Sequence, residues 1–194
     1  MEAGRLMLQK NHQLIKEQVD FAFETTLATR SYVSLIKNVK AKGDEVILLY
    51  YWLSSPTFAK IRVASRVAEG GHHIPSDVIE RRYYRGIHNL TKLYIPICDN
   101  WLVIDNMTVA PETIALGAVN YQQITNIQLQ HPTALMRNKE TQLPELSDKV
   151  MSGMRKAMCK LVETSAAQNK NLVVGDKEGN PISVPAKDLL KSLQ

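Results

Sequence analysis

Apolar residues recur at helical and strand spacing along most of this chain, and the pattern predicts alternating helices and strands. Residues 2–17 place apolar side chains on one helical face, and residues 19–25 are rich in aromatic and β-branched residues, as short strands are. A second helix is expected from Ser31 to Gly43. Residues 45–53 form a nearly continuous apolar strand, which is typical of a parallel sheet covered on both faces.

Two more helices and a strand follow. Ser55 predicts the N-cap of one helix, with Pro56 at its first position, and this helix stops at Gly70. Ser76 predicts the N-cap of the next, and residues 101–106 are patterned as a strand. Strands separated by helices predict parallel crossovers and an α/β fold. Ligands of such sheets bind at the carboxyl ends of the strands.

The C-terminal part is patterned differently. Residues 110–143 are polar and rich in glutamine, with weak periodicity, so no element is predicted there. A helix, the two strands of a hairpin and a last helix are expected over residues 147–167, 171–175, 181–185 and 186–193. We therefore expect an α/β core over residues 1–108. Residues 109–194 are expected to form an extension with a helix and a hairpin, packed on the same domain.

The composition is that of an ordinary globular protein, with 194 residues of which 44% are apolar and 22% charged. This excludes a disordered tail, a collagen-like fibre and a coiled-coil rod. The longest apolar run, residues 46–53, is too short for a membrane span of about 20 residues, and no secretory signal is visible. The two cysteines, Cys98 and Cys159, form no CxxC pair, which favours a reducing, cytoplasmic location over a disulfide scaffold or a zinc site.

Positive charge is concentrated in one segment. The chain carries a formal net charge of +5, and residues 60–92 carry seven basic residues against three acidic ones. Within that segment Arg62 and Arg66 share one helical face, and Arg81 and Arg85 share another. A compact basic segment indicates a polyanionic partner, which could be nucleotide phosphates, nucleic acid or an acidic protein.

Five arginines of this segment are candidates for a phosphate clamp: Arg62, Arg66, Arg81, Arg82 and Arg85. Two helices joined by the short Gly-Gly-His-His-Ile-Pro loop could close these guanidiniums over a triphosphate, because arginine binds phosphate with two parallel hydrogen bonds and stays charged. The alternative interpretation is a solvated basic face that is paired with acidic residues nearby, namely Glu69, Asp77 and Glu80.

Glu24 and Thr26 follow the first predicted strand, where a carboxylate and a hydroxyl can hold a substrate hydroxyl. Alternatively, Glu24 caps the following turn or pairs with Arg30. Adjacent His72 and His73 are interpreted as part of a lid loop, because they have no third ligand at suitable spacing.

Asp105 is interpreted as a turn residue, and no metal site is predicted. None of the nine glycines begins the phosphate-loop pattern GxxxxGK[ST], and no glycine is followed by lysine. The patterns GxGxxG, GxSxG and HExxH are also missing from the sequence.

Several stretches together resemble the zeta-toxin-like family of P-loop kinases and predicted ABC-type ATPases. They lie within residues 21–32, 70–75 and 81–90, and the likeness extends over about residues 2–106. The resemblance implies a three-layer parallel sheet of P-loop-kinase type, with a C-terminal helix and β-hairpin added here. It also implies transfer of the γ-phosphate of ATP, with Mg²⁺, to a hydroxyl of a small substrate, which is a UDP-amino-sugar in zeta toxins.

The same resemblance implies roles for individual residues. Glu24, Thr26 and Arg30 would face the acceptor substrate. Arg66 and Arg82 would be catalytic and would contact the ATP phosphates, and the other three clamp arginines would share that contact. The family places its first strand and its phosphate loop before the helix that opens this chain. We therefore expect a kinase remnant with little or no activity, because that loop holds the phosphates.

Loss of that first strand exposes strand edges, which predicts a homo-oligomer. The rival hypothesis is a non-catalytic protein that docks an acidic partner, such as an antitoxin, or RNA through the arginine-rich face. Specific nucleic-acid binding is not expected, because aromatic residues are only 6% and Tyr83 and Tyr84 fall at core spacing on their helix.

Overall fold

One mixed sheet organises the fold. The computed structural model describes residues 2–118, 121–124 and 143–192. Its four-stranded sheet has the order β1-β2-β3-β4, where the strands are Ile47–Trp52, Asn100–Asp105, Glu112–Ala118 and Tyr121–Ile124. β1 and β2 are parallel, whereas β3 is antiparallel to both β2 and β4. The all-parallel sheet of a P-loop kinase is therefore not shown, and that fold class stays a prediction.

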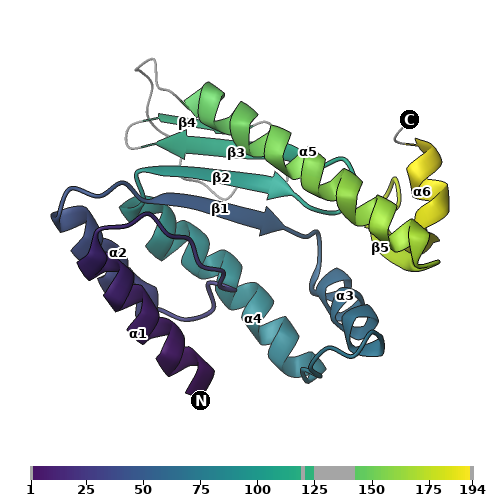
Figure 1. The fold of residues 1–194 in the computed structure, drawn as a ribbon, viewed down its shortest axis with the longest axis horizontal. Helices are drawn as coiled ribbons and strands as arrows, with labels where there is room; N and C mark the ends of the chain where they lie inside the picture. The colour runs from purple at the N-terminus through teal and green to yellow at the C-terminus, as the bar shows by residue number, and fades with distance from the viewer. Residues whose placement is uncertain (1, 119–120, 125–142, 193–194) are drawn as a thin grey trace.

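Helices lie on both faces of this sheet (Figure 1). The elements on one side are α1 (Glu2–Glu17), α2 (Ser31–Ala41), α4 (Ser76–Asn89) and the two short helical turns that follow it, Leu90–Tyr94 and Ile95–Ile97. The long helix α5 (Leu143–Ala167) lies on the other side (Figure 1). The chain crosses from β1 to its parallel neighbour β2 through α3 (Pro56–Ala68) and α4.

The two faces of the sheet have separate apolar cores. The larger core packs Trp101 and Val103 of β2 against Leu90 and Tyr94 of the segment after α4. The other buried members of this core are Leu27, Tyr32, Leu35, Ile36, Trp52, Cys98, Ile114 and Ala115. The smaller core packs Leu102 and Ile104 of β2 against Met151 of α5. Side chains of β2 thus alternate between the two cores, so a shift of this strand by one residue would exchange the two sets of buried side chains.

β1 is covered on one face only. Ile47, Leu49 and Tyr51 are 43%, 37% and 47% exposed, while Leu48 and Tyr50 between them pack on the larger core. The prediction that this strand is buried on both faces is therefore wrong, because α5 packs over β2 and β3 instead. β1 also forms one edge of the sheet, and self-association through this edge stays a prediction.

A second, two-stranded sheet closes the C-terminal part. β5 (Asn171–Gly175) and β6 (Pro181–Pro185) form the predicted hairpin, and α6 (Ala186–Ser192) packs on α5. Asp176 accepts hydrogen bonds from the backbone N–H groups of Glu178 and Asn180 in the hairpin turn. These backbone donors, that of Asn180 first, hold the pKa of Asp176 below its usual value.

The hydrophobic pattern was misleading at two places. Residues 19–25 do not form a strand but a segment without regular secondary structure, in which Phe23 packs against Tyr32 with ring centroids 4.8 Å apart. Its aromatic residues serve core packing rather than strand pairing. Conversely, β3 lies in the polar stretch where no element was predicted. The part of that stretch that includes residues 125–142 lies outside the described residues.

The starts of α2, α3 and α4 were predicted to within one residue, whereas α5 begins at Leu143 rather than at residue 147. Ser55 is the N-cap of α3, as predicted, and its hydroxyl accepts the N–H of Phe58 at 3.2 Å. The N-caps of α2 and α4 are Arg30 and Pro75, one residue before the predicted serines, and neither has a side-chain cap.

The loop of residues 25–30 is held against α4. The side-chain amide of Asn89 donates a hydrogen bond to the carbonyl oxygen of Leu27 at 2.7 Å, and Asn89 is buried. A Cβ at Gly86 would lie 2.7 Å from the carbonyl oxygen of Thr26. Only glycine lets the backbone of the loop approach the helix this closely.

A third contact holds the end of the same loop. The hydroxyl of Tyr94 donates to the carbonyl oxygen of Thr29 at 2.6 Å. Leu27 has a φ of 55°, in the left-handed region, and its side chain is only 4% exposed. A bulky residue adopts this conformation only where its surroundings enforce it, so the loop is a rigid element with a fixed position on α4.

Arg62 ties α3 to the strands beside it. Its guanidinium donates to the carbonyl oxygens of Asn106 at 2.6 Å and of Val173 at 3.3 Å. It also stacks on the Phe58 ring, 4.8 Å from the centroid. Burial lowers the pKa of Arg62, and the nearby Asp105 carboxylate partly offsets this.

Replacing Arg62 by alanine leaves both carbonyl oxygens without this donor. We expect Arg62→Ala to lower the free energy of unfolding by about 2–3 kcal/mol, measured by urea denaturation. Arg66→Ala on the same helix, where the side chain is exposed, should change it by less than about 0.5 kcal/mol. Equal effects of the two substitutions would contradict the structural role of Arg62.

Gly86 and Gly153 form a matched pair for testing the contact between the loop and α4. Gly86→Ala should cost about 1–3 kcal/mol, because its Cβ would clash with the Thr26 carbonyl oxygen. Gly153→Ala on α5 should stabilise the protein by about 0.5–1 kcal/mol, because nothing lies within 4 Å of its Cβ. Thermal or urea unfolding measures both, and a stabilising Gly86→Ala would show that the loop does not lie on this helix.

Candidate anion-binding groove

Four arginines from two elements surround a shallow groove between α4 and the 25–30 loop. Arg30 ends the loop, and Arg81, Arg82 and Arg85 project from α4. The groove consists of two depressions that share Arg85 and Ala28. One is lined by Ala28, Arg30, Tyr84, Arg85, His88 and Asn89. The other is lined by Thr26, Ala28, Thr29, Arg81, Arg82 and Arg85. We call both depressions together the α4 groove.

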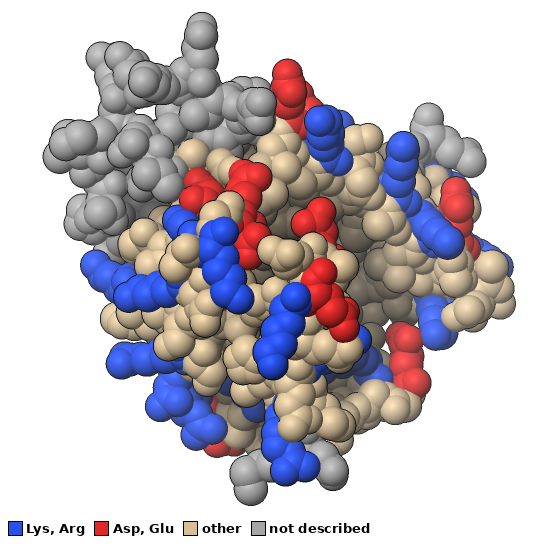
Figure 2. All heavy atoms as spheres, turned by 60° about the vertical axis from the view of Figure 1, so that its left-hand side comes forward, with Lys and Arg blue, Asp and Glu red and all other residues tan. Residues whose placement is uncertain are grey.

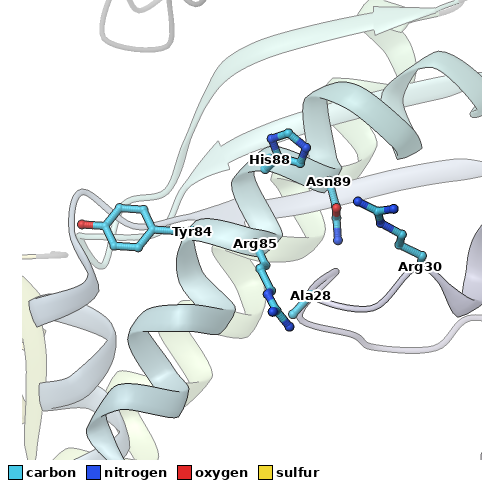
Figure 3. A pocket seen from close by; sticks show the side chains of 6 residues that line it. All are labelled: Ala28, Arg30, Tyr84, Arg85, His88 and Asn89. Carbon is cyan, nitrogen blue, oxygen red and sulfur yellow. The ribbon is translucent and has the colours of Figure 1, made fainter.

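The arginines approach the groove from both sides. In Figure 3 the Arg85 side chain reaches from α4 towards Ala28, and Arg30 comes from the loop. Tyr84 projects from the helix away from Arg30, so it lies at the rim (Figure 3). Because Asn89 and Gly86 fix the loop on α4, the fold sets the distance between the backbone of Arg30 and that of the α4 arginines.

None of these four arginines forms a salt bridge with a carboxylate in the part of the chain that the structure describes. The alternative interpretation of the sequence paired the arginines with Glu69, Asp77 and Glu80. That pairing is wrong: Glu80 pairs with Lys60 and Glu69 with Lys170, and Asp77 forms no salt bridge with a described residue. The solvated face of that interpretation agrees with the exposed arginines of α4. The groove therefore carries positive charge that these acidic side chains do not neutralise.

Basic side chains also stand out over much of the face that Figure 2 shows, in keeping with the net charge of +5. Such a field attracts anions from a distance and raises their association rate. At the groove itself, exposed guanidiniums that are free of carboxylates can donate hydrogen bonds to phosphate or carboxylate oxygens.

The structure brings only some of the predicted clamp residues together. Arg81, Arg82 and Arg85 line the α4 groove with Thr26, and Arg30 joins them there. Arg62 is engaged with backbone carbonyls, and Arg66 is exposed on α3; neither lines the groove. Glu24 is exposed and precedes the loop without lining either depression.

The two tyrosines between these arginines differ from each other. Tyr83 donates to the carbonyl oxygen of Leu53 at 2.8 Å, and its pKa is raised, first by burial and then by the neighbouring Tyr84. Tyr84 is 57% exposed. The prediction that both tyrosines occupy core positions is therefore wrong for Tyr84.

A signal for this exposed tyrosine was present in the sequence. Arg81, Tyr84, Arg85 and His88 follow the spacing i, i+3, i+4, i+7, which places them along one stripe of α4. Three of the four residues on that stripe are basic, which indicates that the stripe faces solvent. The hydrogen bond from Asn89 to the loop and the position of Thr29 were not predicted, because they depend on contacts between residues 62 and 65 positions apart along the chain.

The remaining candidates have structural positions. His72 and His73 are exposed in the loop between α3 and α4. Asp105 accepts the backbone N–H of Met107 at 2.8 Å, which confirms the predicted turn. Among the described residues, no group of three His, Cys, Asp or Glu side chains could hold a metal ion. None of the described helices has the length and apolar character needed to cross a membrane.

Comparison with known proteins gives two matches. Residues 138–194 match the model of a domain of unknown function, DUF8506. An uncharacterized protein of Haemophilus influenzae is 32% identical over 83 residues, which cover 43% of this chain and 59% of that protein. The chain thus spans less than two thirds of the length of this relative. No solved structure matches the chain significantly.

The family match includes α5, the β5–β6 hairpin and α6, and it leaves out α4 and the 25–30 loop. Neither description mentions a kinase or a toxin. The resemblance to the zeta-toxin-like family therefore stays a prediction, and the function of the α4 groove has to be argued from its own residues.

Proposed function

We propose that this protein is a binding protein that docks a polyanionic partner in the α4 groove, without a catalytic step. The observation that carries the proposal is the set of four guanidiniums, on two elements locked together, that form no salt bridge within the described residues. Gathering like charges costs free energy through repulsion, and an anionic ligand removes that cost.

The shape of the site also supports binding rather than catalysis. Both depressions are open to solvent, and Arg30, Arg81, Arg82 and Arg85 are all exposed. Enzymes stabilise the charge that develops in a transition state most strongly in sites that exclude water, because electrostatic interactions are strongest there. An open basic groove instead matches an extended ligand that remains partly hydrated. The partner is either an acidic protein, such as an antitoxin, or a nucleic acid, and the setting we propose is the cytoplasm.

A phosphotransferase of the zeta-toxin kind is the second candidate. It is favoured by the position of Thr26, a predicted acceptor-binding residue, in the same depression as Arg81 and Arg82. ATP and Mg²⁺ would then be required, although the sequence contains no GxxxxGK[ST] loop to hold the phosphates. Transfer of the γ-phosphate of ATP to a small hydroxylated acceptor would support this candidate over the binding protein.

The proposal is tested with long-chain inorganic polyphosphate as the probe. The variant Arg81→Ala/Arg82→Ala/Arg85→Ala should bind it at least about tenfold more weakly than the unmodified protein, because three charge-assisted contacts are lost. Isothermal titration calorimetry at low salt measures the affinity.

The control removes the same charge elsewhere. Arg155, Lys156 and Lys160 are exposed on α5, on the opposite face of the sheet. Their replacement by alanine should leave the affinity within about twofold of the unmodified protein, apart from the small effect of net charge. If both triple variants weaken binding equally, the ligand is held by overall charge and the α4 groove is not its site.

A further inference from the structure

We infer that the ligand of the α4 groove is single-stranded nucleic acid. This inference rests on the proposed function and adds the chemical class of the polyanion. The inference starts from Tyr84, an uncharged residue whose presence in the groove is not explained by the binding of an anion alone. Tyr84 lines the groove together with Arg30, Arg85 and His88, and it is 57% exposed.

The Tyr84 ring is not needed for the fold. Its hydroxyl makes no hydrogen bond with any described residue, unlike the hydroxyl of Tyr83, which bonds to Leu53. One edge contact orients the ring: the Tyr83 and Tyr84 centroids are 5.3 Å apart with an interplanar angle of 85°. An oriented and exposed aromatic ring beside cations provides a face on which a nucleobase can stack.

The spacing along the helix fits successive nucleotides. Arg81, Tyr84, Arg85 and His88 run along about 10 Å of one helix stripe, since each residue advances about 1.5 Å. Phosphates of one strand follow each other at about 3.4 Å along a stacked helix axis, so this stripe spans more than one of them. Arg85 is central because it lines both depressions, so a strand that passes from one depression to the other meets its guanidinium.

An acidic protein would contact the arginines of the groove but not the Tyr84 ring. Its carboxylates can pair with the arginines, but they leave an exposed aromatic ring at the rim without a partner. A duplex keeps its bases stacked on each other, so no base face is available to Tyr84. A flexible single strand supplies both a base face and adjacent phosphates, and it is therefore the ligand class that accounts for all of the groove residues.

The test compares four probes by fluorescence anisotropy: a mixed-sequence RNA of about ten nucleotides, the DNA of the same sequence, its duplex, and polyglutamate of equal charge. Site sizes of about 4–16 nucleotides per binding domain set the probe length. The single strands should bind most tightly, and the RNA and DNA arms show which of the two is preferred.

Tyr84→Ala should weaken single-strand binding about tenfold, because one base loses its stacking partner. Tyr84→Phe, which keeps the ring, should bind within about twofold of the unmodified protein. Tyr51→Ala removes an exposed tyrosine from β1, where the side chain lies on the side of Ile104 and α5 rather than of α4, and should also have no effect. Arg85→Ala should reduce the slope of log affinity against log salt by about 0.7, whereas Tyr84→Ala should leave the slope unchanged.

Two results would overturn the inference in different ways. If polyglutamate binds as tightly as RNA and Tyr84→Ala changes nothing, the ligand class is wrong while the proposed binding function stands. If neither the nucleic acids nor polyglutamate nor polyphosphate binds, the proposed function fails as well. Circular dichroism of Tyr84→Ala should match that of the unmodified protein, because the side chain is exposed, and Tyr84→Leu serves as a second variant without a ring.

Discussion

The close contact between the 25–30 loop and α4 is the constraint on which the candidate site depends. The side-chain amide of Asn89 donates a hydrogen bond to the Leu27 carbonyl oxygen. The absence of a side chain at Gly86 lets the Thr26 carbonyl oxygen approach the helix. Leu27 adopts a left-handed backbone conformation within this contact. Such a conformation costs about 1–3 kcal/mol and persists where surrounding contacts enforce it. The contact thus fixes Arg30 opposite the arginines of α4, and the fold supplies the free energy that keeps these like charges together.

The parts of the fold that were predicted correctly are those with a strong local signal. Ser55 caps α3, apolar residues repeat at helical spacing along α4, and the turn at Asp176 separates the two strands of the hairpin. Long-range pairing left no comparable signal. β3 pairs with β2 although it lies in a polar stretch, and residues 19–25 look like a strand but pack their aromatic side chains on α2. Tertiary contacts override local propensity at both places.

The candidate site was predicted in part for the same reason. The arginines of α4 were found because their charge and spacing are local features of the sequence. Arg62 was grouped with them on the same evidence, yet it bonds to the carbonyl oxygens of Asn106 and Val173, which only the folded chain brings near. Tyr84 was assigned to the core together with Tyr83 because both were placed at core spacing on their helix, yet it is exposed. Tyr83 and Tyr84 point about 100° apart on the helix, so the burial of one does not imply the burial of the other.

The account makes one central claim, that Arg30, Arg81, Arg82 and Arg85 contact the same anionic ligand. The most direct measurement is a titration of ¹⁵N-arginine-labelled protein with a short single-stranded RNA, followed through the guanidinium Nε–H signals in NMR spectra. The account predicts that the signals of these four arginines shift together along one binding curve, while those of Arg62 and Arg155 stay in place. Shifts that are spread evenly over all exposed arginines, or confined to arginines outside the groove, would contradict it.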